Sequence, residues 1–293
     1  IILARCGGKI VGQHACISLW LKYQDKLVKT VEGVDNFVHN DYRGSMRGIH
    51  AKLFQKAEKT AIENGVAVGF GFPNRTGYII GKRLFNHKDL IKIEVLFKRL
   101  SWRSALKRRA KWRFLVNFAG WISNLVIRFF LAIKGKSVSR VKYTWVSTFD
   151  ESINPFWEKV KDQYAIMVQR DFVYLNWRYC RKPDNTYHIL RAELDGSIVG
   201  LIIVKYEDYK DARIGFIMES LAIKDSMVVD SLLKRGLMFL SRNKVDFVLA
   251  RVSSSDPVKR AFYKKGFSQK EDVWNSHIVY VRYSSHVEES VLC

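Results

Sequence analysis

Two stretches that lie far apart in the chain repeat one pattern of residues. "LARCGGKIVGQHACISLWLK" (residues 3–22) and "LRAELDGSIVGLIIVKYEDY" (residues 190–209) each read as a strand, a tight turn and a second strand that opens with Ile-Val-Gly. The turns carry Gly-Gly and Asp-Gly, which are typical of two-residue β-hairpin loops. A helix and a buried strand are expected after each hairpin. Because the repeated unit is long, the pattern predicts a duplicated domain rather than a solenoid of short repeats.

The repeat also predicts the domain boundaries. We expect a first module over residues 1–97, a linker over residues 98–145 and a second module over residues 146–293. The second hairpin follows an aromatic, mostly helical stretch at 150–189, for which the first module has no counterpart. The first module is therefore expected to lack its N-terminal part. A chain of 293 residues, 48% of them apolar, is long enough for two ordinary domains with real cores.

The composition points to an anionic partner. The net charge of +22 favours a phosphate-bearing cofactor, a nucleic acid or a membrane surface. The sequence disfavours nucleic acid, because it contains no known nucleic-acid motif and no aromatic-basic repeat outside the linker. The four cysteines form no Cys-x-x-Cys pair and are interpreted as thiols in a reducing cytoplasm. The seven histidines show no ligand spacing, so we expect no metal site.

The segment between the modules has an unusual composition. No Asp or Glu occurs over residues 95–149; residues 98–114 are basic with interleaved aromatics, and residues 114–133 are mostly apolar with a few polar interruptions. We interpret it as a helical linker whose apolar face packs on the modules. The alternative is an amphipathic helix on an anionic membrane, with residues 98–133 as the contact. The expected location is the cytoplasm, with this segment as a peripheral contact at the inner face of the membrane.

A polar loop in the first module leads directly into a helix. In "FVHNDYRGSMRGIHAKLFQKAEKTAIENG" (residues 37–65), a strand ends, a loop holds two Arg-Gly pairs, and apolar residues recur at helical spacing from Ile49. Backbone N–H groups and the dipole at a helix N-terminus attract anions. Glycine allows close approach, and Arg43 and Arg47 add donors that fork onto phosphate oxygens. The loop therefore has the groups needed to hold a phosphate. The alternative is that it is only a turn, in which the glycines and arginines serve the turn geometry.

The order of elements resembles the GNAT superfamily of acyl-CoA N-acyltransferases. The hairpin, the strand ending "FVHNDYRG", the helix, "VAVGFGF", "FPN" and "GYIIGKRLF" follow one another as in that family. The family loop usually reads Arg or Gln, two residues, Gly, one residue, then Gly or Ala. "VHNDYRGSMRGIHAKLF" resembles bacterial versions of it, with Asn40 at a proline position and Met46 at the first glycine position. The second module resembles the same fold through "YLNWRY", "DGSIVG" and "FYKKGF".

The resemblance implies an α/β (α+β) fold of two GNAT-like modules, each a twisted, mixed, mostly antiparallel sheet flanked by helices. The first module would bind the cofactor; the second would not, because its helix within residues 216–240 starts without glycines. The implied reaction moves an acyl group, with acetyl expected, from acyl-CoA to an amine, such as that of an amino sugar or a cell-surface glycan precursor. Acyl-CoA would be the co-substrate, and no metal is implied.

The resemblance also implies roles for individual residues. Tyr78 matches a tyrosine that protonates the leaving thiolate, and Glu32 or Asp35 would take the proton of the amine. The implied cofactor-binding residues are Asn36, Phe37, Val38, Arg43, Gly44, Ser45, Met46, Arg47, Gly48, Ile49, His50 and Asn74. Structural alternatives stay open at this point: Tyr78 as a core residue, Asn74 as a helix cap, and the two acids as solvated strand-end residues.

Two other functions are compatible with the sequence. A Fem-type transferase would use an aminoacyl-tRNA as donor, which the positive charge favours and the CoA-type loop disfavours. A non-catalytic, membrane-associated scaffold with a degenerate GNAT fold is favoured by Met46 in the loop.

Overall fold

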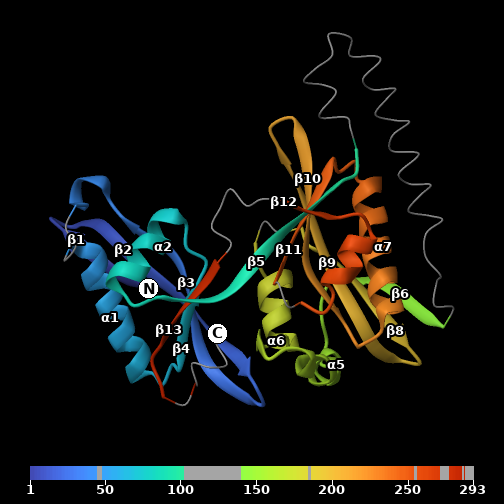
Figure 1. Ribbon diagram of the computed structural model, residues 1–293, viewed down its shortest axis with the longest axis horizontal. Coiled ribbons are helices and arrows are strands. Elements are labelled where there is room, and N and C mark those ends of the chain that lie inside the picture. Colours follow the sequence, from blue (N-terminus) through green and yellow to red (C-terminus); the bar gives the residue numbers. More distant parts are fainter. Residues whose placement is uncertain are drawn as a thin grey trace, which may run out of the picture. The chain divides into compact units, whose positions relative to one another are not determined.

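The protein forms two compact units in a computed structural model (Figure 1). The structure describes residues 1–44, 48–101, 140–183, 186–253, 256–270, 277–285 and 287. Unit 1 comprises Ile1–Ile93, Tyr164–Gln169 and Asp272–Cys293. Unit 2 comprises Glu94–Gln163 and Arg170–Glu271.

Unit 1 is built on a mixed sheet. Its strands follow the order β1 (Ile2–Cys6), β2 (Lys9–Tyr23), β3 (Lys26–Val38), β4 (Val68–Gly71), β13 (His277–Arg282) and the first half of β5 (Lys88–Arg99). β7 (Ile166–Val168) adds to the far end of β2. The pairs β1–β2 and β2–β3 are antiparallel, whereas β3 and β4 are parallel. The predicted Gly7-Gly8 turn closes the first hairpin, with φ values of 53° and 76° that only glycine adopts easily.

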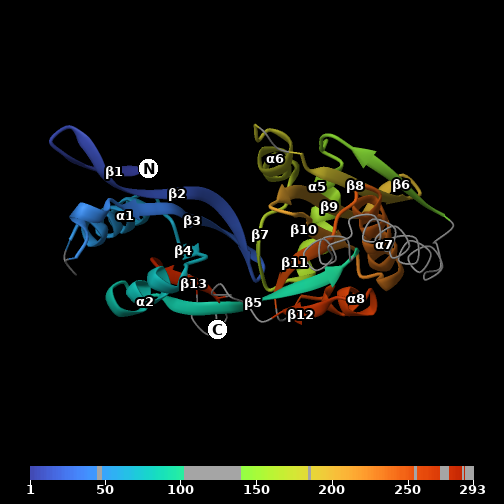
Figure 2. The same cartoon turned by 90° about the horizontal axis from the view of Figure 1, so that it is seen from above.

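The parallel pair β3–β4 needs a crossover, which α1 (Ile49–Glu63) supplies. A short 3₁₀ turn (Asn40–Tyr42) precedes α1, and α2 (Arg75–Leu84) follows β4. α1 lies beside β1 and β2 (Figures 1 and 2) and comes very close to β2 at Gly12. A Cβ at Gly12 would lie only 2.9 Å from Ile49 Cγ2 and 3.1 Å from Leu53 Cδ1. The buried apolar stripe predicted for this helix therefore packs directly on the sheet.

Unit 2 repeats the same order of elements. Its strands are the second half of β5, β11 (Phe247–Ser253), β10 (Ala212–Ala222), β9 (Ser197–Tyr209), β8 (His188–Leu194) and β6 (Val141–Val146), and β12 (Ser268–Lys270) pairs with β5. The helices are α5 (Ile153–Val160), α6 (Phe172–Leu175), α7 (Ser226–Arg242) and α8 (Lys259–Lys264), with a 3₁₀ turn at Lys161–Gln163 and a π-helical turn at Asn176–Cys180. Among the strand pairs described for unit 2, only β10–β11 is parallel, and α7 forms the crossover between these two strands.

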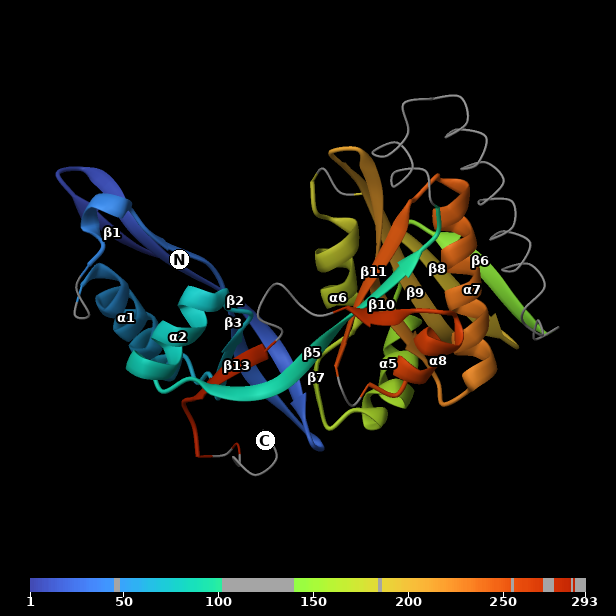
Figure 3. The ribbon, with the colours of Figure 1, turned by 45° about the horizontal axis from the view of Figure 1, so that its top comes forward.

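The core of unit 2 lies between α7 and the sheet (Figure 3). Ile202 on β9 and Leu232 and Leu237 on α7 are fully buried. Gly236 lets α7 approach β9, since a Cβ there would lie 2.9 Å from Ile202 Cδ1. Residues 198–204 of β9 are all buried, as expected for a strand that is covered on both faces. The predicted architecture, mixed and mostly antiparallel sheets with flanking helices, is confirmed in both units.

Two segments of the predicted second module, which starts at residue 146, belong to unit 1 in the structure. β7 and β13 were expected in the second module, but they complete the sheet of unit 1. β13 pairs with β4 and with β5, between two strands that come early in the chain. Local patterns indicate that a short strand exists, but not which strands it pairs with, because that depends on long-range contacts.

The predicted linker over residues 98–145 is only partly described. Its ends are not helical: β5 continues to Arg99, and β6 begins at Val141. Residues 102–139, which carry most of the predicted membrane contact, lie outside the described residues. In the part of the chain that the structure describes, no helix combines the length and the apolar character needed to span a bilayer.

Candidate functional site

A gap opens between β3 and β4 where their pairing ends. The two strands run in register from Thr30 opposite Val68 to Gly33 opposite Gly71, where β4 stops. β3 continues to Val38, and over the described residues no strand pairs with its β4-side edge beyond Gly33. No described strand therefore occupies that edge, which leaves room for a ligand to pair with its backbone groups.

A bulge bends β3 at this gap. The register between β2 and β3 shifts at Asp35 and Asn36, and Asp35 has a φ of 48°. Side chains hold the bulge in place: Gln13 Nε2 donates to the Asp35 carbonyl at 3.0 Å, and the Ala15 N–H donates to Asn36 Oδ1 at 2.9 Å. Bulges of this kind often lie beside functional sites.

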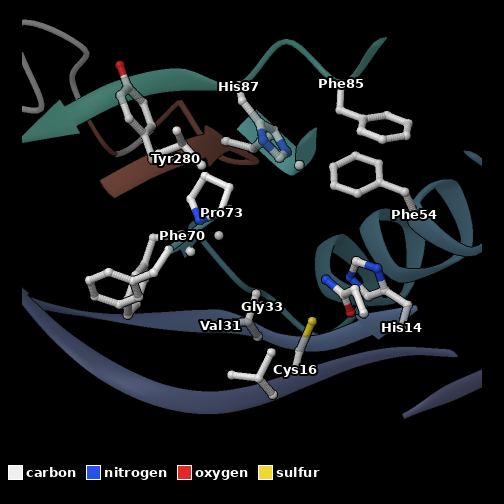
Figure 4. A pocket seen from close by; sticks show the side chains of 18 of the residues that line it. His14, Cys16, Val31, Gly33, Phe54, Phe70, Pro73, Phe85, His87 and Tyr280 are labelled. Atoms are coloured by element: carbon white, nitrogen blue, oxygen red, sulfur yellow. The ribbon is translucent and has the colours of Figure 1, made fainter. Parts of the chain in front are cut away.

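The gap leads into a cavity of about 390 Å³ in unit 1. This volume lies within the range of about 300–1,000 Å³ typical of small-molecule sites. Strands β2, β3, β4 and β13 and helices α1 and α2 all contribute to its wall (Figure 4). Among the described residues that line the cavity, Asp35, at the bulge, is the only acidic one.

Aromatic rings form the side of the cavity next to α1. Phe54 stacks on Phe85, with ring centroids 4.0 Å apart and planes at 19° (Figure 4). His14 meets the Phe54 ring edge-on at 5.8 Å, and His87 lies 5.5 Å from it. His50, in the first turn of α1, lies 5.4 Å from the Phe85 ring. Offset or edge contacts of this type add to the stability from burial alone.

Burial keeps the histidines of this cluster neutral. Burial, and then the nearby His50, lower the pKa of His14 to about 4. The same two causes lower the pKa of His87 to about 4, and burial lowers the pKa of His50. The Nδ1 atoms of His14 and His87 are buried and have no hydrogen-bond partner among the described residues. Both nitrogens are enclosed by protein atoms, and His87 Nδ1 lies against Gly81 of α2.

Acid is expected to destabilise unit 1 through these histidines. An unfolded histidine titrates near 6.5, so between about pH 6.5 and 4 the unfolded chain binds more protons than the folded one. The stabilising contribution of neutral His14 and His87 is complete above pH 6.5 and is lost as the pH falls towards 4. Thermal unfolding followed from pH 7.5 to 4.5 should show a smaller acid-induced drop in Tm for His14→Leu than for the wild type. Parallel pH profiles for the two proteins would contradict this assignment.

The loop predicted to hold a phosphate is described at both ends. Arg43 Nε donates to the Val38 carbonyl at 2.6 Å, and Gly44 adopts a φ of 118°. Gly48 is the N-cap of α1; no side chain caps this helix, and its first turn contains no acid. Ser45, Met46 and Arg47 lie outside the described residues. Among the described residues, neither the N-cap nor the first turn of α1 places a carboxylate at these backbone N–H groups.

The corresponding helix in unit 2 begins differently. Only three residues, Ile223 to Asp225, join β10 to α7, and Asp225 is the N-cap. Asp225 Oδ1 accepts a hydrogen bond from the Met227 N–H at 2.7 Å. A carboxylate already occupies this helix N-terminus and would repel a phosphate. That only the first module binds the cofactor stays a prediction.

The predicted site residues separate into two groups. The cavity is lined by Asp35, Asn36, His50 and Asn74. It is not lined by Glu32, Phe37, Val38, Arg43, Gly44, Gly48, Ile49 or Tyr78. Glu32 points to the face of β3 opposite to its neighbours Val31 and Gly33, because side chains alternate along a strand. Asn74 caps α2, with its Oδ1 accepting from the Gly77 N–H at 2.8 Å.

Tyr78, predicted as the proton donor, interacts with β5. Its hydroxyl donates to Asp89 Oδ2 at 3.1 Å, and Lys82 Nζ lies 2.8 Å from the same carboxylate oxygen. Partial burial and the hydrogen bond to Asp89 raise the pKa of Tyr78 above its ordinary value. To protonate a thiolate in the cavity, the hydroxyl would first have to leave Asp89.

Several lining residues were not singled out from the sequence. They are His14, Cys16, Gly33, Phe54, Gly69, Gly71, Phe85, His87, Val279, Val281 and Tyr283. The glycines carried a usable signal, because glycine inside a strand often marks a close approach by a ligand or another backbone. Nothing in the local sequence could have placed Tyr283 beside residues of β4.

The chain is similar in structure to solved N-acyltransferases. A conserved protein from Enterococcus faecalis V583, described as a probable N-acyltransferase, matches with a TM-score of 0.63 at 12% identity, over 97% of this chain and 60% of that one. A GCN5-related N-acetyltransferase from Anabaena variabilis matches with 0.60 at 13% identity, over 96% and 62%. The N-myristoyltransferase of Saccharomyces cerevisiae, solved with myristoyl-CoA, matches with 0.60 at 12% identity, over 94% and 67%.

These similarities establish the fold. No protein-family model and no curated sequence matches the chain. The chain spans about 60% of the length of the first two solved proteins. The fold predicted from the sequence, that of the GNAT superfamily, is confirmed.

Proposed function

We propose that this chain, which has the fold of the GCN5-related N-acyltransferases, transfers an acyl group from acyl-CoA to an amine. The observation that carries the proposal is the gap between β3 and β4, which leads to a cavity and lies next to the uncapped N-terminus of α1. A helix N-terminus is suited to a pyrophosphate, and an unpaired strand edge is suited to the amide groups of a pantetheine arm.

The described residues can be given roles in this reaction. The amine attacks the thioester carbonyl, a C–N bond forms, the C–S bond breaks, and the amine proton is lost while the thiolate gains one. Asp35 is the proposed acceptor of the amine proton, directly or through water, because it is the acid that lines the cavity. Asn36 offers backbone groups to the pantetheine, and Arg43 offers donors to the pyrophosphate. Tyr78 remains the proposed donor to the thiolate, on condition that its hydroxyl leaves Asp89.

The acceptor is proposed at the level of a class. The resemblance to the GNAT superfamily favours the amine of an amino sugar or of a cell-surface glycan precursor. A panel of amino sugars and alkyl amines, assayed with the acyl-CoA that binds best, would identify the class by release of free CoA thiol.

Cofactor binding is tested most directly by calorimetric titration with CoA and acetyl-CoA at low and moderate salt. We expect micromolar affinity in the wild type and binding weaker by roughly ten- to a hundredfold in Arg43→Ala, since a charge-assisted hydrogen bond contributes roughly 1.5–3 kcal/mol. Arg83→Ala is the matched control, because Arg83 is an exposed arginine in the last turn of α2. Binding that is equally salt-sensitive in all three proteins would show that the loop is only a turn.

A further inference from the structure

Three glycines lie side by side on the floor of the cavity, next to Val31 and Val281. Gly33 on β3 pairs with Gly71 on β4, and Gly69 follows in the next row of the same face. Residues that pair in register share a face of the sheet, so Cys16 on β2 and Val279 on β13 complete the first of these rows. Three adjacent positions on the two central strands thus carry no side chain, and backbone forms the surface.

This floor is open rather than packed. A Cβ built on Gly33 would meet only Asn36 Nδ2 at 3.7 Å and the Phe70 carbonyl at 3.8 Å. A Cβ on Gly71 would meet only the Gly33 carbonyl at 3.6 Å. Neither glycine has a left-handed φ, so neither is required by the backbone. Both leave free space above the sheet.

Tyr283 closes the far end of this space. A Cβ on Gly69 would lie 2.8 Å from the Tyr283 hydroxyl oxygen and 3.0 Å from its ring, so the tyrosine lies against that glycine. The Tyr283 N–H donates to the Ala67 carbonyl at 2.9 Å, which anchors the residue just beyond β13. Along β4, Gly71 lies nearest the gap and Gly69 further in, where the Tyr283 ring lies against it.

Part of the wall above the floor is apolar, whereas Asp35, Asn36 and Asn74 give other parts of the cavity polar side chains. The rings of Phe54 and Phe85 and the side chain of Val281 line the space. Burial raises the pKa of the Cys16 thiol, which keeps it protonated, and His14 is neutral. The apolar part of the wall suits hydrocarbon. An acetyl group would fill only a small part of a cavity of about 390 Å³ and would leave apolar walls without packing partners.

We propose that the acyl group bound here is an apolar chain longer than acetyl, which lies on the glycine floor and ends against Tyr283. The proposal rests on the acyl-CoA site of the proposed function. From a thioester at the bulge near Asp35, the chain runs over Gly33 and Gly71 towards Gly69. Tyr283 then sets the longest chain that fits.

Calorimetric titration with CoA, acetyl-, butyryl-, octanoyl- and dodecanoyl-CoA, each below its micellar concentration, tests the proposal. Affinity should rise by up to about fourfold for each added methylene that becomes buried, and then level off. Gly71→Val fills the floor and should bring the ratio of octanoyl-CoA to acetyl-CoA affinity close to one; Gly33→Val is the second variant for the same test. Tyr283→Ala should move the plateau to longer chains, whereas Tyr283→Phe, which keeps the ring, should not.

The outcomes separate the two proposals. Binding of CoA with equal affinity for acetyl- and octanoyl-CoA would overturn the chain proposal and leave the proposed function standing. A chain-length preference that is unchanged in Gly71→Val, Gly33→Val and Tyr283→Ala would place the chain elsewhere and would also overturn it. Failure to bind CoA or any thioester in the series would overturn the proposed function itself, and the chain proposal with it.

Discussion

The Gly48→Asp variant is expected to lose CoA binding while α1 stays folded. Gly48 is the N-cap of α1, with φ and ψ of −74° and −165°, which an aspartate can adopt without strain. The new carboxylate would cap the helix as Asp225 caps α7, and it would occupy the place of the pyrophosphate. Lost hydrogen bonds and like-charge repulsion should together weaken binding by roughly 2 kcal/mol or more, which is about thirtyfold.

An uncharged capping residue distinguishes the effect of the negative charge from the effect of filling the N-cap position. Gly48→Ser provides a capping oxygen without a charge and should bind CoA more tightly than Gly48→Asp does. Circular dichroism and thermal unfolding should show both variants as stable as the wild type, since replacing an N-cap glycine changes stability by only a few tenths of a kcal/mol. If calorimetry shows that Gly48→Asp binds CoA as tightly as the wild type, the N-terminus of α1 is not the phosphate site.

Glu219→Ala should destabilise unit 2 by about 3–5 kcal/mol, the usual effect of removing one partner of a buried ion pair. Glu219 Oε1 lies 2.9 Å from Arg170 Nε and accepts a hydrogen bond from the Tyr179 hydroxyl at 2.8 Å. Only 9% of the Glu219 side chain and 15% of the Arg170 side chain are exposed. The alanine leaves the arginine buried without the carboxylate that faces it.

An exposed ion pair provides the matched control for Glu219. Glu207 lies 3.0 Å from Lys205 with half of its side chain exposed, so Glu207→Ala should change stability by less than about 1 kcal/mol. Urea denaturation of the two variants measures the difference. The double variant Arg170→Met, Glu219→Leu should regain much of the loss, because an apolar pair needs no counter-charge. Equal denaturation midpoints for Glu219→Ala and Glu207→Ala would show that the buried pair contributes no more than a surface one.

Local features of the fold were predictable from the sequence. Asp195-Gly196 closes the second hairpin with φ values of 48° and 79°, as the turn residues predict. α1 begins at Ile49, as the apolar spacing predicts, and Gly65 follows the helix with a φ of 68°, a conformation typical of a glycine just after a helix end. The energies that decide these features come from residues next to one another, so the sequence pattern is sufficient to place them.

The candidate site was only partly predictable. The loop and the end of the strand before it were predicted from the Arg-Gly pairs and the family resemblance, and Asn36 and His50 do line the cavity. Tyr78 and Glu32 do not, because the first is held by Asp89 and the second points to the other face of β3. One residue along a strand reverses the face of a side chain, and a pattern of exposed acids does not reveal which face a cavity occupies.

The sequence by itself determined the repeated hairpins, the helix after the loop and the type of fold, because turns and helix ends depend on neighbouring residues. Only the tertiary structure decided that β13 joins the sheet of unit 1 and that Tyr283 comes to rest against Gly69. More than 200 residues separate Tyr283 from Gly69 in the chain. Their contact depends on strand pairing and burial across the whole unit, so no local pattern of residues encodes it.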